Sequence, residues 1–429
     1  MRYGEIIAVG SELLLGGRLD TNSLFLTEGL ASVGVEVRFK SVVGDEEADI
    51  VRAIRAAVSR AGVVLLTGGL GPTGDDCTRE AVARATGRSL RRNAEALEGM
   101  RQRLAAWGRT PTRAQLRQGL IPSGAEVLAN PVGSAPGFAL AWRGCLIAAL
   151  PGVPAEAEAM FSQALAPKLA TVQAGAGAPW IRRHLLHTFG VPEAELEERL
   201  RTAIERYDRV RLGLLASPLG VTVSLTEVGE AGRRARDGEF DRAVRAVRRR
   251  VGVALYGEGA DTMEGVIGRR LADRRLILAV AESCTGGLIG HRITQVPGSS
   301  AYLDRVAVCY SNRAKVELLG VPEELIRRHG AVSQPVAAAM ARGIRLRSRA
   351  AVGLSVTGIA GPDGGTRDKP VGLVYVGLNG RSGRSGQTAA LTREFRFHGT
   401  RETIKLRASQ AALNLLREWL MATSRVRTS

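Results

Sequence analysis

One short segment carries side chains whose types and spacing could do nucleophilic chemistry. Ala281–Gly287 reads AESCTGG, follows an apolar run and precedes the apolar helical pattern Leu288–Ile293. A strand–turn–helix junction places Ser283 at the carboxyl edge of a sheet, where the following helix offers unpaired N–H groups. Ser283 could therefore be a nucleophile that faces an oxyanion hole of backbone N–H groups. Ser283 and Thr285 could equally cap the helix, and Cys284 stays open as an alternative nucleophile.

A lysine in the next segment is a candidate base. Of the 60 Lys and Arg residues only five are lysine, and one of them, Lys315, follows Tyr310 by five residues. Arg stays protonated in proteins, whereas a partly buried Lys can lose its proton near neutral pH. Lys315 therefore could activate Ser283, and the alternative is an ordinary surface lysine on a helix.

A Gly-rich loop provides a third feature of the same region. Ser355–Gly365 reads SVTGIAGPDGG and follows the expected strand Ala351–Leu354. Such a loop at a strand end suits a phosphate or a ribose. Together the three loops predict one composite pocket, with a Ser nucleophile and an anionic substrate, in a hydrolase or a transferase.

The N-terminal third has its own Gly-rich loop. Thr67–Thr78 reads TGGLGPTGDDCT and begins at the end of the expected strand Val63–Thr67. The adjacent carboxylates of Asp75 and Asp76 can cap the following helix or hold Mg²⁺ beside substrate phosphates. Acidic residues after other expected strands would add oxygen ligands that suit a hard cation.

Three segments position these loops. Residues 1–170 alternate β-rich runs with helical patterns, which predicts a parallel sheet covered by helices on both faces. Residues 171–257 begin with the linker-like run 174–179 and read as a small α+β domain without obvious catalytic residues. Residues 258–429 return to an α/β pattern and end in a long helix over Thr400–Leu420.

The composition of the chain limits the classes of protein to which it could belong. No apolar run in the 429 residues approaches the roughly 18 that a membrane span needs, and four scattered cysteines fit a reducing, cytoplasmic compartment. The net charge of +18 would suit a nucleic-acid partner. The arginines, however, are spread along the chain, and the densest cluster, Arg233–Arg250, falls mostly on one expected helix. A solvated helix face and an anion-binding patch are the two readings of that cluster.

Beyond these patterns, the C-terminal blocks resemble those of the CinA family in order and spacing. The blocks are Ala281–Gly287, Tyr310–Lys315, His329–Ser333, Gly358–Gly365 and Lys369–Gly372. The resemblance implies an amidase of pyridine-nucleotide salvage that hydrolyses nicotinamide mononucleotide to nicotinate mononucleotide and ammonia without a cofactor. It implies Ser283 as the nucleophile, with Tyr310 and Lys315 as the groups that activate it. The implied oxyanion- and substrate-binding residues are Cys284, Thr285, Gly286, Gly287, Thr357, Gly358, Ile359, Ala360 and Gly361.

The N-terminal blocks resemble the three-layer molybdopterin-binding fold as it occurs in the same family, and they are Glu12, Asn22, Asp45, Thr67–Thr78, Asn130–Gly137 and Pro151–Pro154. The middle segment resembles the KH-like domain of that family by position and length. This resemblance implies a second activity, the hydrolysis of ADP-ribose with a divalent cation such as Mg²⁺. The implied metal ligands are Asp75 and Asp76. The implied nucleotide site comprises Gly10, Glu12, Asn22, Asp45, Gly68, Gly69, Gly71, Pro72, Thr73 and Thr78.

Two other classes of function compete with this bifunctional enzyme. One is a molybdopterin-binding protein, suggested by the N-terminal fold alone. The other is a protein linked to competence or DNA damage that acts through DNA or a recombinase. The N-terminal fold and the family analogy also lead us to expect a homodimer.

Overall fold

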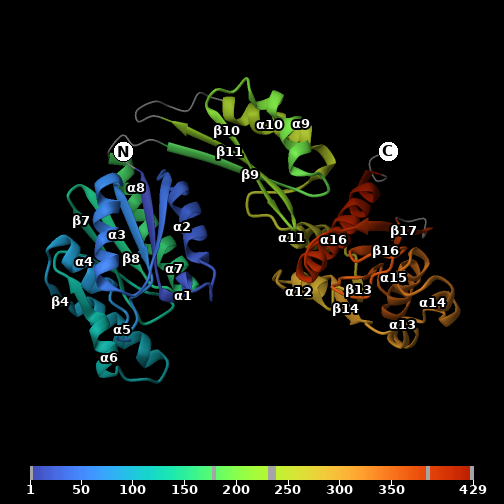
Figure 1. Cartoon of the computed structure of the whole chain (residues 1–429), viewed down its shortest axis with the longest axis horizontal. Coiled ribbons are helices and arrows are strands. Elements are labelled where there is room, and N and C mark those ends of the chain that lie inside the picture. Colours follow the sequence, from blue (N-terminus) through green and yellow to red (C-terminus); the bar gives the residue numbers. More distant parts are fainter. Residues whose placement is uncertain (1–2, 176–179, 230–237, 383–386, 426–429) are drawn as a thin grey trace. The chain divides into compact units, whose positions relative to one another are not determined.

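The computed structural model describes residues 3–175, 180–229, 238–382 and 387–425. The chain divides into two compact units, residues 1–183 with 226–238 and residues 184–225 with 239–429 (Figure 1). Within the part of the chain that is described, no helix is long and apolar enough to cross a membrane. Residues 174 and 175 of the expected linker end a helix, and residues 176–179 lie outside the described residues.

The first unit is built on a mixed six-stranded sheet. Four neighbouring strands are parallel, as the alternating pattern predicts, and two antiparallel strands extend one edge. In sheet order the strands are β2 (Val37–Val43), β1 (Gly4–Val9), β3 (Val63–Thr67), β8 (Cys145–Leu150), β7 (Gly137–Trp142) and β6 (Glu126–Leu128).

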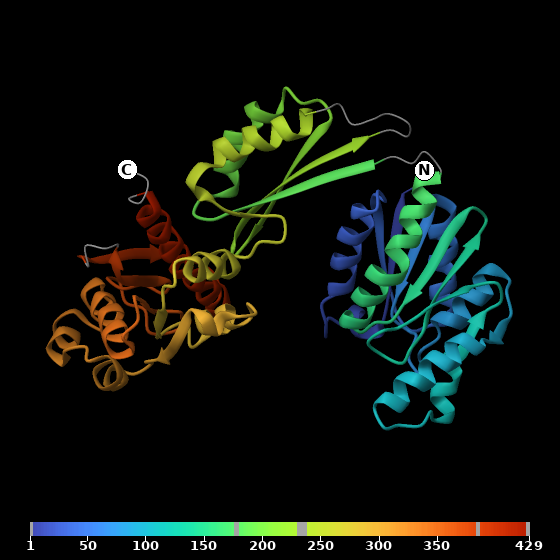
Figure 2. The same cartoon turned by 180° about the vertical axis from the view of Figure 1, so that it is seen from behind.

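Helices cover both faces of this sheet because successive side chains of its strands point to opposite faces. Ile6 of β1 joins one buried cluster and its neighbour Ile7 joins the other. The Ile6 side is covered by α2 (Thr21–Ser32), α7 (Pro154–Met160) and α8 (Ala166–Gly175), and the Ile7 side by α3 (Glu47–Arg60) and α4 (Thr78–Thr86) (Figures 1 and 2). The three-layer fold is confirmed. Smaller elements are α1 (Ser11–Leu14), β4 (Leu90–Arg92), α5 (Ala94–Ala106), α6 (Arg113–Leu116) and β5 (Leu120–Pro122).

The middle segment forms a four-stranded sheet with two helices, which confirms the α+β expectation. Its strands in order are β10 (Val210–Ser217), β11 (Gly220–Gly229), β9 (Trp180–Thr188) and β12 (Leu255–Glu258), and its helices are α9 (Glu193–Ile204) and α10 (Glu239–Val251).

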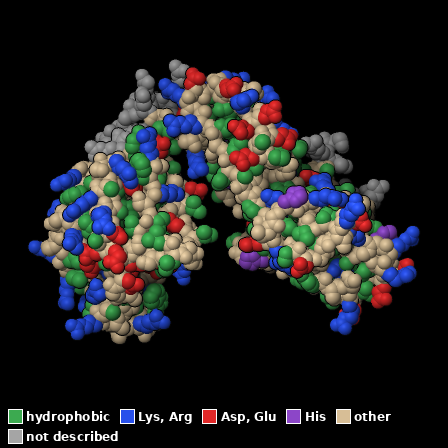
Figure 3. Space-filling view, viewed as in Figure 1, with side chains coloured by type: hydrophobic (Ala, Val, Ile, Leu, Met, Phe, Trp, Pro, Cys, Tyr) green, Lys and Arg blue, Asp and Glu red, His purple; other side chains and the backbone are tan. Residues whose placement is uncertain are grey.

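Helix α10 carries most of the expected basic cluster. Its apolar residues, such as Val244 and Val247, are buried, whereas Arg242, Arg245 and Arg249 are exposed. This is the pattern of a solvated helix face. Residues 233–236 of the cluster lie outside the described residues. Over the face seen in Figure 3, Lys and Arg side chains are scattered among Asp and Glu.

The C-terminal segment is built on a five-stranded sheet. In order its strands are β14 (Leu303–Val308), β13 (Leu278–Glu282), β15 (Val352–Gly358), β16 (Leu373–Ser382) and β17 (Gln387–Arg396). The first three are parallel, so their carboxyl ends meet at one edge. The prediction that a loop begins at Ser355 is wrong. Residues 355–358 pair with β16 and extend β15, so the loop begins after Gly358.

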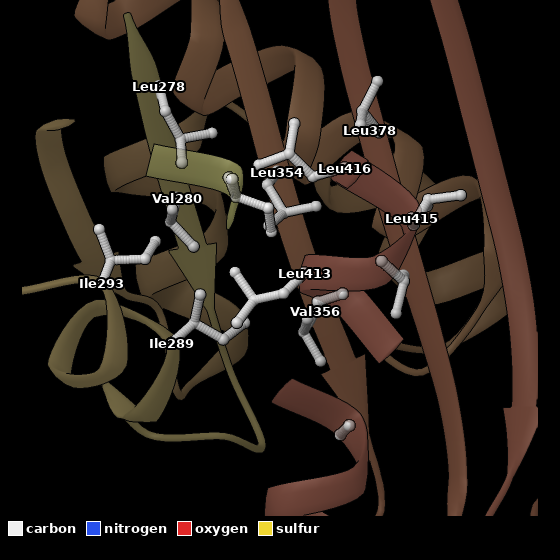
Figure 4. Close-up of a cluster of buried hydrophobic side chains, with 14 of the residues drawn as sticks. Leu278, Val280, Ile289, Ile293, Leu354, Val356, Leu378, Leu413, Leu415 and Leu416 are labelled. Carbon is white, nitrogen blue, oxygen red and sulfur yellow. The ribbon is translucent and has the colours of Figure 1, made fainter. Parts of the chain in front are cut away.

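One face of this sheet is covered by α11 (Met263–Asp273), α12 (Leu288–Thr294) and α16 (Arg401–Arg425). Figure 4 shows Leu278, Val280, Leu354 and Val356 of the sheet in one cluster with side chains of α12 and α16.

The other face carries α13 (Asn312–Leu319), α14 (Glu323–His329) and α15 (Gln334–Ser348). Helix α15 packs very close to the strands. A Cβ at Gly353 would lie 2.2 Å from the carbonyl oxygen of Ala341. Glycine in the strand is therefore required for this approach.

Candidate active site

Ser283 and Lys315 meet at the carboxyl edge of the C-terminal sheet. Ser283 follows β13 directly, and its N–H donates to the carbonyl of Val356 on the neighbouring strand at 3.0 Å. Lys315 reaches it from α13, with Nζ 3.0 Å from Ser283 Oγ. Ser283 is only 7% exposed and Lys315 only 1%. The two candidate residues therefore form a direct contact in a largely desolvated site.

The surroundings of Lys315 orient its amine. Nζ also donates to the carbonyl oxygens of Cys309 at 2.9 Å and Tyr310 at 3.1 Å. A neutral amine has two N–H groups and one lone pair, and a carbonyl oxygen can only accept. With both N–H groups on the carbonyls, the lone pair faces Ser283 Oγ. Burial lowers the pKa of Lys315 from its ordinary value of 10.5, which favours this neutral form.

Glu282 shapes the turn that follows the nucleophile. Its fully buried carboxylate accepts hydrogen bonds from the N–H groups of Gly287 at 3.0 Å, Ile289 at 3.1 Å and Gly290 at 2.8 Å. An ionised carboxylate at a helix N-terminus is stabilised by the helix dipole and by these bonds. Glu282 was not among the predicted site residues, although its place between an apolar strand and a Ser-containing turn is visible in the sequence.

The same contacts reduce the number of N–H groups that could form the expected oxyanion hole. The N–H of Gly287 is bound to Glu282, and the N–H of Gly286 donates to the carbonyl of Ser283 at 3.1 Å. The N–H groups of Cys284 and Thr285 make no hydrogen bond to any other residue that the structure describes. These two are therefore the available donors beside Ser283 Oγ.

Cys284 lies in the hydrophobic core. Its Sγ would be 3.1 Å from a Cβ at Gly358, so the thiol packs directly on that strand. Burial raises the pKa of this thiol to about 12. A thiol of such high pKa is a poor nucleophile near neutral pH, which favours Ser283 over Cys284 as the candidate nucleophile.

The hydroxyl of Tyr310 contacts Arg401 and not Lys315, the residue with which it was expected to act. Tyr310 is 61% exposed, and its Oη accepts a hydrogen bond from Arg401 Nη2 at 2.8 Å. Arg401 Nη1 also donates to the carbonyl of Gly361. Tyr310 thus contacts Lys315 through its backbone carbonyl and Arg401 through its hydroxyl. Arg401 was missed because it lies 91 residues from Tyr310 in sequence.

The Gly-rich loop is held against its neighbours by backbone contacts. Ile359 donates its N–H to the carbonyl of Leu373 at 2.9 Å, and Thr357 Oγ1 donates to the carbonyl of Ala331 at 2.9 Å. Lys369 Nζ donates to the carbonyls of His329 and Val332 at 2.6 and 2.8 Å. Three separate blocks of the sequence are therefore joined at this edge of the sheet.

In the N-terminal domain, the expected loops also converge. Asn22 Nδ2 donates to Thr67 Oγ1 at 2.8 Å and to the carbonyl of Gly152 at 2.9 Å. The N–H of Ser11 donates to Asp45 at 2.8 Å. Gly68 has a φ of +106°, and a Cβ there would meet the carbonyl oxygen of Val9 at 2.1 Å. The ends of β1, β2, β3 and β8 are therefore tied together, with glycine required at the tightest approach.

The adjacent carboxylates of this domain differ in their surroundings. Asp76 accepts hydrogen bonds from the N–H of Gly71 at 2.8 Å, the N–H of Thr73 at 2.9 Å and the Thr73 hydroxyl at 2.5 Å. It therefore closes its own loop. Asp75 is exposed, and a hydrogen bond from Thr73 lowers the pKa of its carboxyl. In the ranges that the structure describes, no three His, Cys, Asp or Glu side chains gather as a metal cage.

Comparisons with known proteins agree along the chain. The family model of the CinA C-terminal domain matches residues 260–420, that of the probable molybdopterin binding domain matches residues 5–171, and that of the damage-inducible protein CinA KH domain matches residues 183–257. A CinA-like protein of Gemmatimonas aurantiaca is 40% identical over 96% of this chain and 95% of its own length. A CinA-like protein of an Anaeromyxobacter species is 41% identical over 96% of this chain and 98% of its own.

A solved structure is also similar to part of this chain. The competence/damage inducible protein CihA from Agrobacterium tumefaciens is 40% identical over 38% of this chain and 97% of its own, with a TM-score of 0.34. The relatives that match almost end to end decide the assignment, and by them this chain belongs to the CinA family.

Proposed function

We propose that the C-terminal domain is an amidase that hydrolyses nicotinamide mononucleotide to nicotinate mononucleotide and ammonia. The observation that carries the reaction class is the buried contact of 3.0 Å between Lys315 Nζ and Ser283 Oγ. A free hydroxyl is a poor nucleophile, and an adjacent base is what activates it. The choice of substrate rests on the family.

In the proposed acylation step, the orientation of Lys315 allows it to activate Ser283. Ser283 Oγ attacks the carboxamide carbon while the lone pair of Lys315 accepts the hydroxyl proton. The carbonyl oxygen becomes an oxyanion, and the N–H groups of Cys284 and Thr285 are the donors available to stabilise it. The Lys315 ammonium then gives its proton to the amide nitrogen. The C–N bond breaks, ammonia leaves and an ester on Ser283 remains.

Deacylation reverses the proton transfers. Water attacks the ester carbon, and Lys315 accepts a proton from that water. The bond between the carbonyl carbon and Ser283 Oγ breaks, and Lys315 returns the proton to Oγ. The product is nicotinate mononucleotide, and nucleophile and base are both side chains of this domain.

Ammonia release from nicotinamide mononucleotide by the full chain tests this proposal. The wild type is expected to turn over, Ser283→Ala to lose roughly 10⁴-fold or more in kcat, and Cys284→Ala to keep most of its rate. Circular dichroism of each variant checks that the fold is intact. A wild type without ammonia release, or an active Ser283→Ala protein, would overturn the assignment.

A second activity, the hydrolysis of ADP-ribose by the N-terminal domain, is favoured by the convergence of its loops around Asn22 and Thr67. The residues fit a cation that arrives with the substrate, because Mg²⁺ is often held by one or two carboxylates together with substrate phosphates. Asp75 would supply that carboxylate, since Asp76 is taken up by its own loop. The cation would neutralise charge on the pyrophosphate.

A further inference from the structure

A pocket lies beside the turn that follows Ser283. It has a volume of about 390 Å³ and opens over the beginning of α16. Its lining residues are Leu288, Arg401, Glu402, Lys405 and Leu406. Two cations and one carboxylate leave its rim with a net positive charge.

Lys405 is the cation of this pocket that has no partner among the described residues. It is partly exposed, and across the described ranges its ammonium makes no hydrogen bond and no ion pair. It is also one of only five lysines in a chain that otherwise uses arginine. Arg401, by contrast, already donates to Gly361 and Tyr310.

The position of Lys405 links the pocket to the nucleophile. Its Nζ lies 3.8 Å from the place where a Cβ of Gly286 would stand. Gly286 is exposed, has a φ of +61° and comes three residues after Ser283. A ligand in this pocket would therefore lie against the turn that carries the nucleophile, where no side chain intervenes.

A buried network fixes this spacing. Arg292 of α12 donates to Ser409 at 2.8 Å and to Gln410 at 2.6 Å on α16, and it also pairs with Glu264 at 2.8 Å. The two helices that line the pocket are thereby held together. The dipole of α16, which begins at Arg401, adds positive potential at the same end.

We propose that Lys405 binds the phosphate monoester of the nucleotide while its carboxamide lies at Ser283. The proposal deepens the amidase assignment and rests on it. A phosphate dianion is the ligand that an unpaired ammonium, a positive rim and a helix N-terminus together favour. The partly buried apolar side chains of Leu288 and Leu406 lower the effective dielectric beside Lys405 and strengthen this attraction.

Substrates with and without the phosphate test the proposal. For nicotinamide mononucleotide, Lys405→Ala is expected to raise KM by about 10- to 100-fold with little change in kcat, which is the loss of one charge-assisted contact. For nicotinamide riboside, which lacks the phosphate, KM is expected to stay within about twofold. Lys405→Arg should restore much of the binding, because the positive charge remains.

Two matched variants sharpen the result. Lys40→Ala makes the same change at an exposed lysine of the N-terminal domain and should leave both KM values unchanged. Glu402→Gln removes the only negative charge of the pocket and should lower KM for the mononucleotide. An equal effect of Lys405→Ala on both substrates, or a fall in kcat alone, would overturn the phosphate role.

A binding measurement separates this proposal from the amidase assignment. Ribose 5-phosphate should bind the wild type in calorimetry, and both ribose with the wild type and ribose 5-phosphate with Lys405→Ala should show no comparable heat. If ammonia release fails while this difference is present, the phosphate site stands and the amidase proposal falls. If the wild type and Lys405→Ala bind ribose 5-phosphate equally, the phosphate site falls whatever the activity.

Discussion

Lys315 Nζ lies 3.0 Å from Ser283 Oγ, although the two residues are 32 positions apart in the sequence. Both carbonyl partners of Lys315 belong to the segment at the end of β14, so the strand that precedes α13 also sets the direction of the amine. The contact is made at the edge where β13 and β14 end side by side. The chemistry of the site therefore depends on two parallel strands and on the helices that follow them.

Replacement of Lys315 should show whether it acts as a base. Lys315→Ala and Lys315→Arg are both expected to lower kcat for ammonia release by about 10²- to 10⁴-fold, because Arg keeps the charge but cannot give up its proton. If the lysine only bound substrate, Arg would rescue partly and the loss would fall on KM. Substantial kcat in Lys315→Arg, measured with steady-state kinetics, would remove Lys315 as the base.

The pH dependence of the same enzyme follows from the lowered pKa of Lys315. Only the neutral amine can accept the Ser283 proton, so kcat should fall about tenfold per pH unit below that pKa and level off above it. Between the lowered pKa and the ordinary value of 10.5, the unfolded chain holds the proton that the folded protein has lost. The contribution of Lys315 to the unfolding free energy should therefore rise with pH across this window.

Chemical denaturation at several pH values measures that contribution, with Lys315→Met as the reference that cannot titrate. The difference in unfolding free energy between wild type and variant should change with pH in favour of the wild type as pH rises. A kcat that increases toward acid pH would contradict the kinetic part of the prediction. A difference in unfolding free energy that stays constant or falls as pH rises would contradict the stability part.

Glu282 should act on catalysis through the turn and not through substrate. In Glu282→Gln one acceptor oxygen becomes an NH₂ group that faces backbone N–H donors, which breaks part of the network at Gly287, Ile289 and Gly290. We expect a lower melting temperature and a kcat reduced by about 10- to 100-fold, with little change in KM. Glu317→Gln, at an exposed ion pair of α13, is the control and should behave as wild type. Unchanged kcat and melting temperature in Glu282→Gln would show that the turn does not need this carboxylate.

Chelation should separate the two proposed activities. Amidase turnover is expected to survive EDTA, because its nucleophile and base are Ser283 and Lys315. Hydrolysis of ADP-ribose is expected to stop and to return when Mg²⁺ is added. Asp75→Asn should weaken this second activity, whereas Asp76→Asn should also lower the melting temperature, because Asp76 closes its loop through three hydrogen bonds. ADP-ribose hydrolysis at an unchanged rate in EDTA would refute the prediction that this activity depends on a metal ion.

The sequence by itself was enough to predict the local structure of this protein, namely its strands, its turns and the residues that lie on them. Short apolar strands that alternate with helical patterns predicted the layers of both α/β domains, because strands covered by helices on both faces read as continuous apolar runs. The same local logic placed Ser283 at a strand–turn–helix junction. The rarity of lysine in the chain pointed to Lys315, because arginine cannot do the chemistry of a base.

Only the tertiary structure decided which distant groups share the site. The sequence of α16 predicts a helix but not which strands it crosses, and in the structure residues 408–417 are buried all round the helix. Its packing on β15 and β16 brings Arg401 to Tyr310 and Lys405 to Gly286. The pairing of β15 with β16 likewise moved Ser355 into a strand. These contacts depend on which apolar surfaces are buried together, and that choice is made by the whole fold.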